Sequence, residues 1–245
     1  MSLPHVVQPR DIESGACEIE RIRAEYARRK RDIPQAFYSW DRVFNCFTHT
    51  QLVRDCIAAL TQAKLFPLEN RSVADIGCGS GTWLLEFAQW EASDLHGIDL
   101  DESKIERAKA RFPSAKLHAG DARQLPWSDN SFDLVSQFTL FTSILSDTVK
   151  QQIAREMWRV VKPGGVIIWF DFRVNNPRNK SVQGITSREI HSLFPDCSIR
   201  LRPVTLAPPI ARRIVPVSWI AASLLEKIPV LRTHYLGIIR KSSSR

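Results

Sequence analysis

Between residue 67 and the C-terminus, short runs of β-branched residues alternate with segments of helical periodicity. SVADIG is followed by TWLLEFAQW, DLHGIDL by ESKIERAKARF, and FDLVSQF by TVKQQIAREMWRVV. AKLHAGD and GVIIWFDF add two further strands, the second after a turn at Lys162–Gly165 (KPGG). Such alternation is typical of an α/β fold with a doubly wound, Rossmann-like parallel sheet.

The C-terminal part extends this sheet. SIRLRPVTL and HYLGIIRK predict a sixth and a seventh strand, and we expect seven strands, mostly parallel, with the last one antiparallel. The stretch between them, about 207–231, is far longer than a hairpin turn and predicts a helical insertion. Thr186, followed three residues later by Glu189, has the capping-box pattern that starts a helix.

Residues 1–66 precede the alternation and predict a helical N-terminal extension that caps the domain. EIERIRAEYARRKRDIP is a charged helical segment that ends at Pro34, and NCFTHTQLVRDCIAALTQAKLF is an amphipathic one that ends at Pro67. We therefore expect residues 67–245 to form the α/β domain, with the helical insertion inside it.

Composition excludes several classes of protein. The 245 residues are 44% hydrophobic, and no segment approaches the roughly 18 apolar residues of a membrane span. The N-terminus lacks the pattern of a signal peptide, which predicts a cytoplasmic protein. The cysteines are scattered without a C-x-x-C pair, and no His, Cys or carboxylate cluster has metal-ligand spacing, so that we expect neither disulfides nor a metal site.

Three glycines, Gly77, Gly79 and Gly81, lie directly between the first strand and the next helix, where missing side chains let a ligand approach the backbone. The dinucleotide fingerprint G-x-G-x-x-G is not met, because Thr82 stands in place of the third glycine, and no G-K-[ST] phosphate loop is present. Asp75, just before the glycines, suits a ligand that carries positive charge there. S-adenosylmethionine, with its ammonium and sulfonium groups, is such a ligand.

At these motifs the chain resembles the class I S-adenosylmethionine-dependent methyltransferases, in particular the type-11-like group. The resemblance rests on D-x-G-x-G-x-G, the acid of GIDLD, AGDARQLPWSDNSFDLV and VVKPGG, in the family's order, over roughly residues 70–172.

The resemblance implies S-adenosylmethionine as cofactor and a role for each motif. Asp75 and the glycine loop would hold the methionine part, Asp99 the ribose hydroxyls and Asp121 the adenine amine, while Ala122 would offer its backbone N–H to the ring. For Asp99 the position agrees independently, since a strand-end carboxylate about 20 residues beyond the glycines can accept two hydrogen bonds from a ribose diol.

The loops after the fourth and fifth strands are expected to face the methyl acceptor, because ligands bind outside the carboxyl ends of the strands in open α/β sheets. The second of these loops, in FDFRVNNPRNKSVQGIT, is dense in hydrogen-bond donors that suit phosphate, carboxylate or sugar hydroxyls. The predicted acceptor-binding residues are Arg173, Asn175, Asn176 and Arg178. A solvated loop is the alternative interpretation.

Transfer to a hydroxyl needs a base as well as alignment of the reactants. Asp171, at the end of the fifth strand, is the first candidate, and a capping role for the following loop is the alternative. His49 and His191 are the other candidates, although each lies in a helical pattern where an exposed histidine is common.

We therefore predict O-methylation of a sugar, glycolipid or related polar metabolite, with a polar or anionic small molecule or glycan as acceptor. The loop after the fifth strand and LRTHYLGIIR are similar to segments of uncharacterised bacterial methyltransferases of polysaccharide and glycolipid gene clusters. RNA methylation is one alternative, disfavoured because no separate RNA-binding module or interleaved aromatic and basic residues are present. A non-catalytic S-adenosylmethionine-binding protein is another.

The C-terminal part is basic. From Arg200 onward, nine Lys or Arg residues stand against one acid, Glu226, which accounts for the net charge of +8. The insertion at 207–231 combines apolar residues with flanking arginines, which favours either a lid or a peripheral contact with an anionic membrane.

Overall fold

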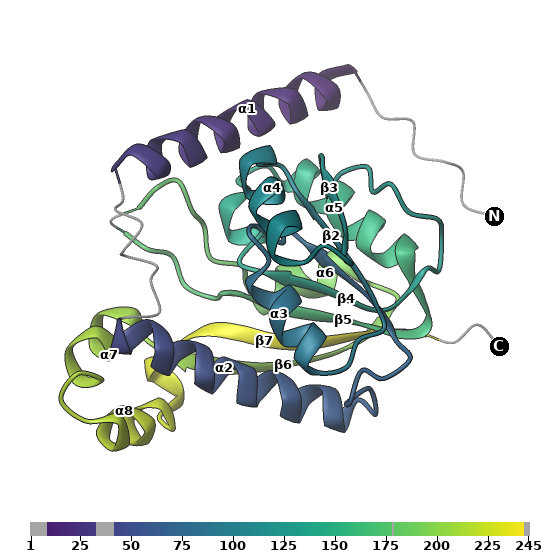
Figure 1. The fold of residues 1–245 in the computed structure, drawn as a ribbon. Helices are drawn as coiled ribbons and strands as arrows, with labels where there is room; N and C mark the ends of the chain where they lie inside the picture. Colours follow the sequence, from purple (N-terminus) through teal and green to yellow (C-terminus); the bar gives the residue numbers. More distant parts are fainter. Residues whose placement is uncertain (1–8, 33–41, 178, 243–245) are drawn as a thin grey trace.

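The computed structural model describes residues 9–32, 42–177 and 179–242, which form one mixed seven-stranded sheet with helices on both faces (Figure 1). The strand order is β3-β2-β1-β4-β5-β7-β6. The strands are β1 Ser72–Ile76, β2 Asp94–Asp99, β3 Lys116–Ala119, β4 Phe132–Phe138, β5 Val161–Phe172, β6 Cys197–Leu206 and β7 Arg232–Lys241.

Strands β1 to β5 pair in parallel, and β7 pairs antiparallel with both β5 and β6. The predicted Rossmann-like sheet with an antiparallel last strand is therefore confirmed. Because β6 runs in the same direction as β5, the ends of both strands lie at one edge of the sheet. We call this edge the carboxyl edge.

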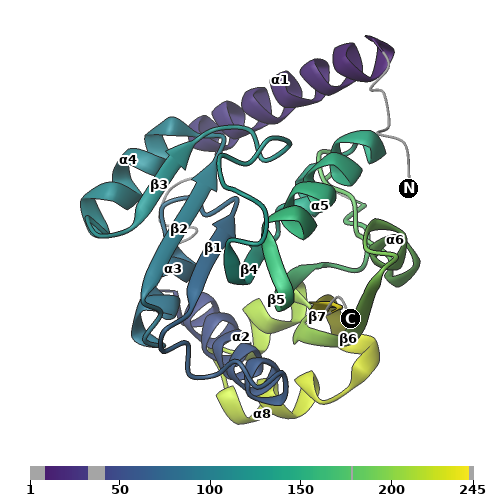
Figure 2. The same cartoon turned by 90° about the vertical axis from the view of Figure 1, so that its right-hand side faces the viewer.

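The helices follow the strands in the alternating order expected from the sequence. They are α1 Pro9–Asp32, α2 Val43–Gln62, α3 Thr82–Gln89, α4 Glu102–Arg111, α5 Asp147–Val160, α6 Ser187–Leu193, α7 Pro208–Ile214 and α8 Trp219–Glu226, with short 3-10 helices η2 Phe141–Ser143 and η3 Pro229–Leu231. Figure 2 shows α2 and α5 on opposite sides of the sheet.

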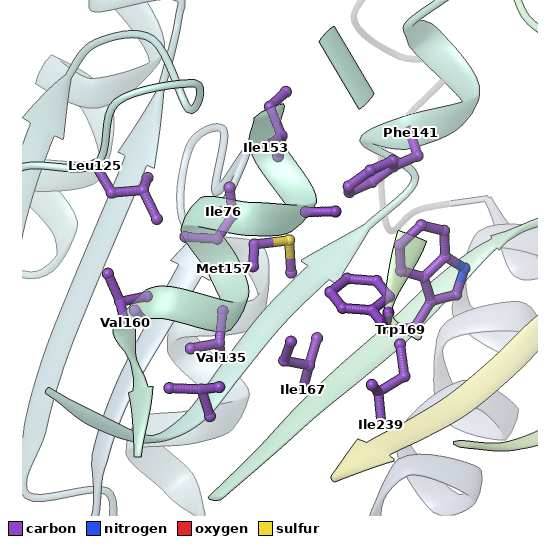
Figure 3. Close-up of a cluster of buried hydrophobic side chains, with 14 of the residues drawn as sticks. Ile76, Leu125, Val135, Phe141, Ile153, Met157, Val160, Ile167, Trp169 and Ile239 are labelled. Carbon is purple, nitrogen blue, oxygen red and sulfur yellow. The ribbon is translucent and has the colours of Figure 1, made fainter. Parts of the chain in front are cut away.

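The core has two parts because strand side chains alternate between the faces. On one face, Ile167 and Trp169 of β5 pack with Ile153 and Met157 of α5 (Figure 3). On the other, Ile168 belongs to a cluster with α2 and α3. Each large apolar side chain buried in this way stabilises the fold by about 1.5–3 kcal/mol.

Helix α2 belongs to this second part of the core. Cys56 and Leu60 of α2 are fully buried and share a cluster with Trp83 of α3 and Leu236 of β7. Helix α2 thus covers one face of the sheet, whereas α1 lies across the loops at its edge (Figures 1 and 2). The predicted boundary at residue 67 stays a prediction.

Two local predictions need correction. The KPGG segment is not a turn before the fifth strand but part of β5, where Val161 pairs with Phe132 and Val166 with Leu134, so that the intervening residues form an irregularity with Gly164 at φ 76°. Helix α1 begins at Pro9, well before the charged segment.

The cap predicted at Thr186 is present, since its side chain accepts a hydrogen bond from the backbone N–H of Glu189 at 3.2 Å. The Glu189 carboxylate does not complete the box seen in the sequence, because it accepts from Lys150 Nζ at 2.7 Å. The pair joins α6 to α5. An ion pair between helices has therefore taken the place of the second local hydrogen bond.

Candidate cofactor and acceptor site

The glycine loop leaves β1 at the middle of the carboxyl edge. Gly77, Gly79 and Gly81 all have positive φ, at 77°, 54° and 85°, a region that L-residues with a side chain rarely adopt. A Cβ on Gly79 would meet only the Lys104 side chain, at 3.9 Å, whereas a Cβ on Gly81 would lie 2.7 Å from Phe112. The backbone is therefore open to a ligand at Gly79, and Gly81 is required by packing.

Asp75 lies beneath this loop. Its carboxylate is buried and accepts a hydrogen bond from the Ser136 hydroxyl at 2.6 Å. Burial raises the pKa of Asp75 to about 7. A cation bound nearby would favour the ionised form, because it would compensate for the loss of hydration. The position therefore suits the positively charged ligand that the sequence predicted.

Asp99, at the end of β2, orders the glycine loop. One carboxylate oxygen accepts from the backbone N–H of Gly79 at 2.8 Å, and the other accepts from that of Asp101 at 2.9 Å. Each oxygen has lone pairs left after these bonds, so that Asp99 can still accept hydrogen bonds from a diol.

Asp121 follows β3 and is paired within its own loop. Its carboxylate accepts from the backbone N–H of Arg123 at 2.9 Å and forms a salt bridge to that guanidinium at 2.6 Å. Asp121, Ala122, Asp99 and Gly77 line one cavity. The structure thus brings four of the predicted cofactor residues together, and Asp75, Gly79 and Gly81 lie in the adjoining strand and loop.

Helix α1 roofs this cavity with Ile19, Ile22 and Tyr26. The Lys104 ammonium lies 4.0 Å from the centroid of the Tyr26 ring, and burial together with the charge of Asp99 raises the pKa of Tyr26 to about 12. The predicted cap of the domain therefore lies directly over the predicted ribose site.

Two side chains fasten α1 to the loop after β4. Glu18 accepts a hydrogen bond from the backbone N–H of Leu145 at 2.6 Å, and Arg21 donates to the carbonyl oxygen of Ser143 at 2.7 Å. Glu18 and Arg21 also form a two-point ion pair with both N–O distances at 2.8 Å. These contacts could not be predicted from the sequence, because the charged residues of α1 have the pattern of a helix face exposed to solvent.

The cavity under α1 has a volume of about 40 Å³, whereas sites for ligands of this class measure about 300–1,000 Å³. The chemistry of the residues fits S-adenosylmethionine: the glycine loop and Asp75 would hold its methionine part, Asp99 its ribose and Asp121 with Ala122 its adenine. Helix α1 forms one wall of this cavity, so that a movement of α1 away from the loops would enlarge it.

On the acceptor side, Asp171 is sealed inside the protein with 1% of its surface exposed. It accepts hydrogen bonds from the backbone N–H groups of Thr142 and Phe172, both at 3.1 Å, and burial raises its pKa to about 8. The side chain therefore ties η2 to the end of β5. Its role as a base stays a prediction.

The two candidate histidines lie on opposite faces of the sheet. His49 of α2 has Nε2 at 2.8 Å from Glu86 Oε1, and its ring centroid lies 5.4 Å from that of Trp83. His191 of α6 is exposed, with Nδ1 at 2.7 Å from the carbonyl oxygen of Ser187 in the same helix. The structure does not bring them together.

The loop after β5 is held against its neighbours. The backbone N–H of Arg173 donates to the Thr233 carbonyl at 2.9 Å, and the Arg173 guanidinium lies over the Tyr235 ring at 5.2 Å. The Asn175 side chain accepts from the backbone N–H of Gly184 at 2.8 Å. Asn175 therefore shapes the loop.

The other predicted donors differ from one another. Asn176 is exposed, and its carbonyl oxygen accepts from the backbone N–H of Asn179 at 3.0 Å. Arg178 lies outside the described residues. Within the described ranges, no group of three or more His, Cys, Asp or Glu side chains could hold a metal ion.

Residues around the end of β4 were missed in the sequence. Gln137 is fully buried, and its side-chain oxygen accepts from the backbone N–H of Leu140 at 3.1 Å. Thr139, between them, is exposed and has φ 60°, an unfavourable conformation for a β-branched residue. The signal available in the sequence was the presence of polar residues at the end of an otherwise apolar strand.

His234, at the start of β7, was also missed. Its ring is buried, stacks on Phe170 with centroids 4.6 Å apart and lies 3.8 Å from Phe172. Burial lowers the pKa of His234 to about 3, so that the ring is neutral at physiological pH. Together with Trp83 stacked on Phe138 at 3.6 Å, it gives the carboxyl edge an aromatic layer.

Comparison with known proteins agrees with this geometry. A family model described as methyltransferase domain matches residues 73–165. Demethylmenaquinone methyltransferase of Listeria welshimeri is 33% identical over 134 residues, 51% of this chain and 56% of the relative. The chain spans about half the length of the curated relatives it matches.

Two solved structures share the fold at low identity. One is an S-adenosylmethionine-dependent methyltransferase from Mesorhizobium loti (TM-score 0.56, 17% identity, 75% of this chain and 96% of that chain). The other is phosphoethanolamine N-methyltransferase 1 of Haemonchus contortus (TM-score 0.62, 16% identity, 93% and 50%). The matched domain and the shared fold support a class I S-adenosylmethionine-dependent methyltransferase with S-adenosyl-L-methionine as its cofactor.

Proposed function

We propose that this methyltransferase acts on a hydroxyl group of a sugar, a glycolipid or a related polar metabolite. The observation that carries the proposal is the way the loop after β5 is held. Backbone hydrogen bonds of 2.9 Å join Gln183 to Thr142 of η2 and Arg173 to Thr233 at the start of β7, so that the loop is held between these two elements. Its exposed Asn176 and Lys180 are donors suited to hydroxyl, phosphate or carboxylate groups of an acceptor.

S-adenosylmethionine supplies a methyl group on a positively charged sulfur. In the proposed transfer the carbon–sulfur bond breaks as the oxygen–carbon bond forms, and the proton of the hydroxyl passes to a base. The protein's part is to hold the acceptor in line and to receive that proton.

Two of the candidate bases lie near the end of β4. His49 is partly exposed, and its Nε2 lies 2.8 Å from Glu86 Oε1. Asp171 would need to become uncovered before it could accept a proton from an acceptor, because it is buried beneath η2. We therefore propose His49 as the base for an acceptor bound in the present geometry.

Three variants separate these candidates. We expect His49→Ala to lower turnover by about 10²–10⁴-fold with cofactor affinity retained, as is typical for loss of a general base. His191→Ala serves as the control on an exposed histidine. A normal rate in His49→Ala, with a large loss in Asp171→Asn, would reassign the proton to the carboxylate.

A second candidate acceptor is a quinone ring. Its support is the aromatic layer formed by Trp83, Phe138, Phe170 and His234, on which a planar ring could stack. The Listeria welshimeri relative is named for methylation of demethylmenaquinone.

The test offers methyl-labelled S-adenosylmethionine together with a bacterial glycolipid extract, demethylmenaquinone or total RNA. We expect label in glycolipid, recovered as a methyl ether on a sugar after hydrolysis and located by mass spectrometry. Label only in the quinone would select the second candidate, and label only in RNA would overturn both. Tight cofactor binding without transfer to any of the three would favour a non-catalytic binding protein.

A further inference from the structure

The α7–α8 insertion carries an unusual concentration of exposed apolar side chains. Of the ten large hydrophobic residues exposed among those that the structure describes, six fall between positions 217 and 230. Val217, Val230 and Ile220 are 84%, 83% and 75% exposed. We call the six residues the apolar patch: Val217, Trp219, Ile220, Leu224, Ile228 and Val230.

The patch is displayed by a folded unit. Val215 of the segment between α7 and α8 and Ala222 of α8 are buried in a cluster with Phe47 of α2. Trp219 meets Phe47 edge to face, with ring centroids 5.3 Å apart. These contacts hold the inner side of the insertion against α2. The outer side chains are exposed because nothing in the described chain covers them.

The outer side of α8 is continuous. Ile220 and Leu224 are four residues apart, and therefore lie on the same face of the helix. The neighbouring Ile228 and Val230 continue the apolar surface into η3. Contiguous apolar surface of this kind on a folded chain marks a contact with a protein or a membrane.

The exposed charges of the insertion have one sign. Arg212, Arg213 and Lys227 are exposed, and Arg212 lies over the Phe44 ring at 5.2 Å. The only acid between residues 207 and 231, Glu226, is buried. Apolar side chains bordered by cations complement a bilayer that contains anionic lipids.

A second copy of the chain fits this surface less well. In a symmetric dimer the same patch would meet itself, and Arg212, Arg213 and Lys227 would lie near their own counterparts. A membrane span is also not indicated, because no helix in the described ranges is long and apolar enough to cross a bilayer.

The position of the patch connects it to the acceptor. Leu206 at the end of β6 pairs with Arg232 of β7, and Val204 and Phe172 both pair with His234. The insertion therefore rises from the same carboxyl edge as the loop after β5, and Figure 1 shows that loop extending toward the side of α7 and α8.

We propose that the apolar patch docks the enzyme on the surface of an anionic lipid bilayer, so that the carboxyl edge faces an acceptor held in that bilayer. The statement about the acceptor rests on the proposed function, whereas docking itself does not. Val217, Ile220 and Val230 enter the boundary between head groups and acyl chains, and the exposed cations meet lipid phosphates.

Flotation with vesicles tests the docking. Vesicles of phosphatidylcholine with phosphatidylglycerol are expected to carry the protein, and those of phosphatidylcholine alone to carry much less. Ile220→Asp with Val230→Asp should lower the partition coefficient by at least about tenfold, because two side chains lose their apolar contact. Arg213→Gln with Lys227→Gln should lower it by roughly fivefold for each charge.

Leu85→Asp is the matched control, since Leu85 is an exposed apolar residue on α3 outside the patch. It should bind vesicles like the wild type, and calorimetry with S-adenosylhomocysteine should show that all variants are folded. The proposal is overturned if wild-type protein ignores anionic vesicles, if the Asp pair binds them normally, or if the Asp pair instead dissociates a wild-type dimer.

A second assay separates docking from the proposed function. With a monoglucosyl lipid in vesicles and methyl glucoside in solution, the Asp pair should lose methylation of the lipid and keep its rate on the soluble sugar. A wild-type protein that binds vesicles but methylates neither sugar would refute the proposed acceptor and leave docking intact. Equal loss on both sugars would show that the patch supports the active site and not the membrane contact.

Discussion

Helix α1 and the α7–α8 insertion both lie at the carboxyl edge, yet one turns its apolar residues inward and the other leaves them exposed. Ile22 of α1 is buried over the predicted cofactor residues, and Glu18 and Arg21 bind backbone groups of the loop after β4. Ile220 and Val230 of the insertion face outward. Figures 1 and 2 place the two elements on opposite flanks of the sheet.

The difference shows that a helical pattern does not reveal what its apolar face will meet. The half of the edge under α1 is covered by that helix. The half beside α7 and α8 carries apolar side chains that nothing in the described chain covers. A cofactor that enters from one side and an acceptor that arrives from the other would meet between them, near the ends of β4 and β5.

The largest effect is expected from a substitution that fills the space over the glycine loop. Gly79→Trp should weaken binding of S-adenosylhomocysteine by at least about 100-fold, measured by calorimetry, because the indole would occupy the open space above the loop. Gly79→Ala is the control, since its methyl group has room at 3.9 Å from Lys104 and adds only the strain of a positive φ. Equal loss in both variants would mean that backbone strain, and not occupied space, abolishes the site.

Asp171 is buried at the end of β5. Its protonation should make the free energy of unfolding depend on pH. The folded chain holds a proton up to a pKa of about 8, whereas the unfolded chain releases it near 3.8. The free energy of unfolding should therefore fall as pH rises from about 4 to 8. Asp171→Asn should reduce this fall by about 1–3 kcal/mol, measured by denaturant titration across pH.

Asp75 titrates in part of the same range, because burial raises its pKa to about 7, so that some decline should persist in Asp171→Asn. Identical pH profiles for this variant and the wild type would show that Asp171 is already ionised in the folded protein.

A smaller effect is expected from weakening the attachment of α1 to the loop after β4. Glu18→Gln should speed the exchange of bound S-adenosylhomocysteine about tenfold in stopped-flow measurements, because it weakens charged hydrogen bonds to Leu145 and Arg21. Glu25→Gln is the matched control, since Glu25 pairs with Arg28 and Arg29 inside the same helix. Unchanged exchange in Glu18→Gln would mean that α1 does not control access.

No effect is expected from chelation. EDTA should leave cofactor binding and turnover unchanged, because neither half of the edge gathers three metal-ligating side chains among the described residues. Activity lost in EDTA and restored by magnesium would show that a metal joins the acceptor half.

Much of the fold was predictable because its signals are local. The alternation of apolar strands with helical periods predicted the sheet, and Thr186 predicted the cap of α6. The KPGG segment was misread, because a Pro-Gly-Gly sequence favours a turn wherever pairing with a neighbouring strand does not override it.

The candidate site was predictable to a lesser degree. Gly77, Asp99 and Asp121 meet at one cavity because parallel strands end at the same edge, which is a property of the topology. The burial of Asp171 was not predictable, since it depends on where η2 packs. The same holds for His234, whose neighbours Phe170 and Phe172 come from a different strand.

The sequence by itself determined the class of fold, the order of the cofactor motifs and the helical character of both additions, because periodicity and strand–loop–helix order are written in neighbouring residues. Only the tertiary structure decided that α1 covers the predicted cofactor residues, that Asp171 is buried and that the apolar patch has no cover in the described chain. Burial is set by contacts between residues far apart in the chain, and the sequence of a helix does not by itself show which surface its apolar side chains will meet.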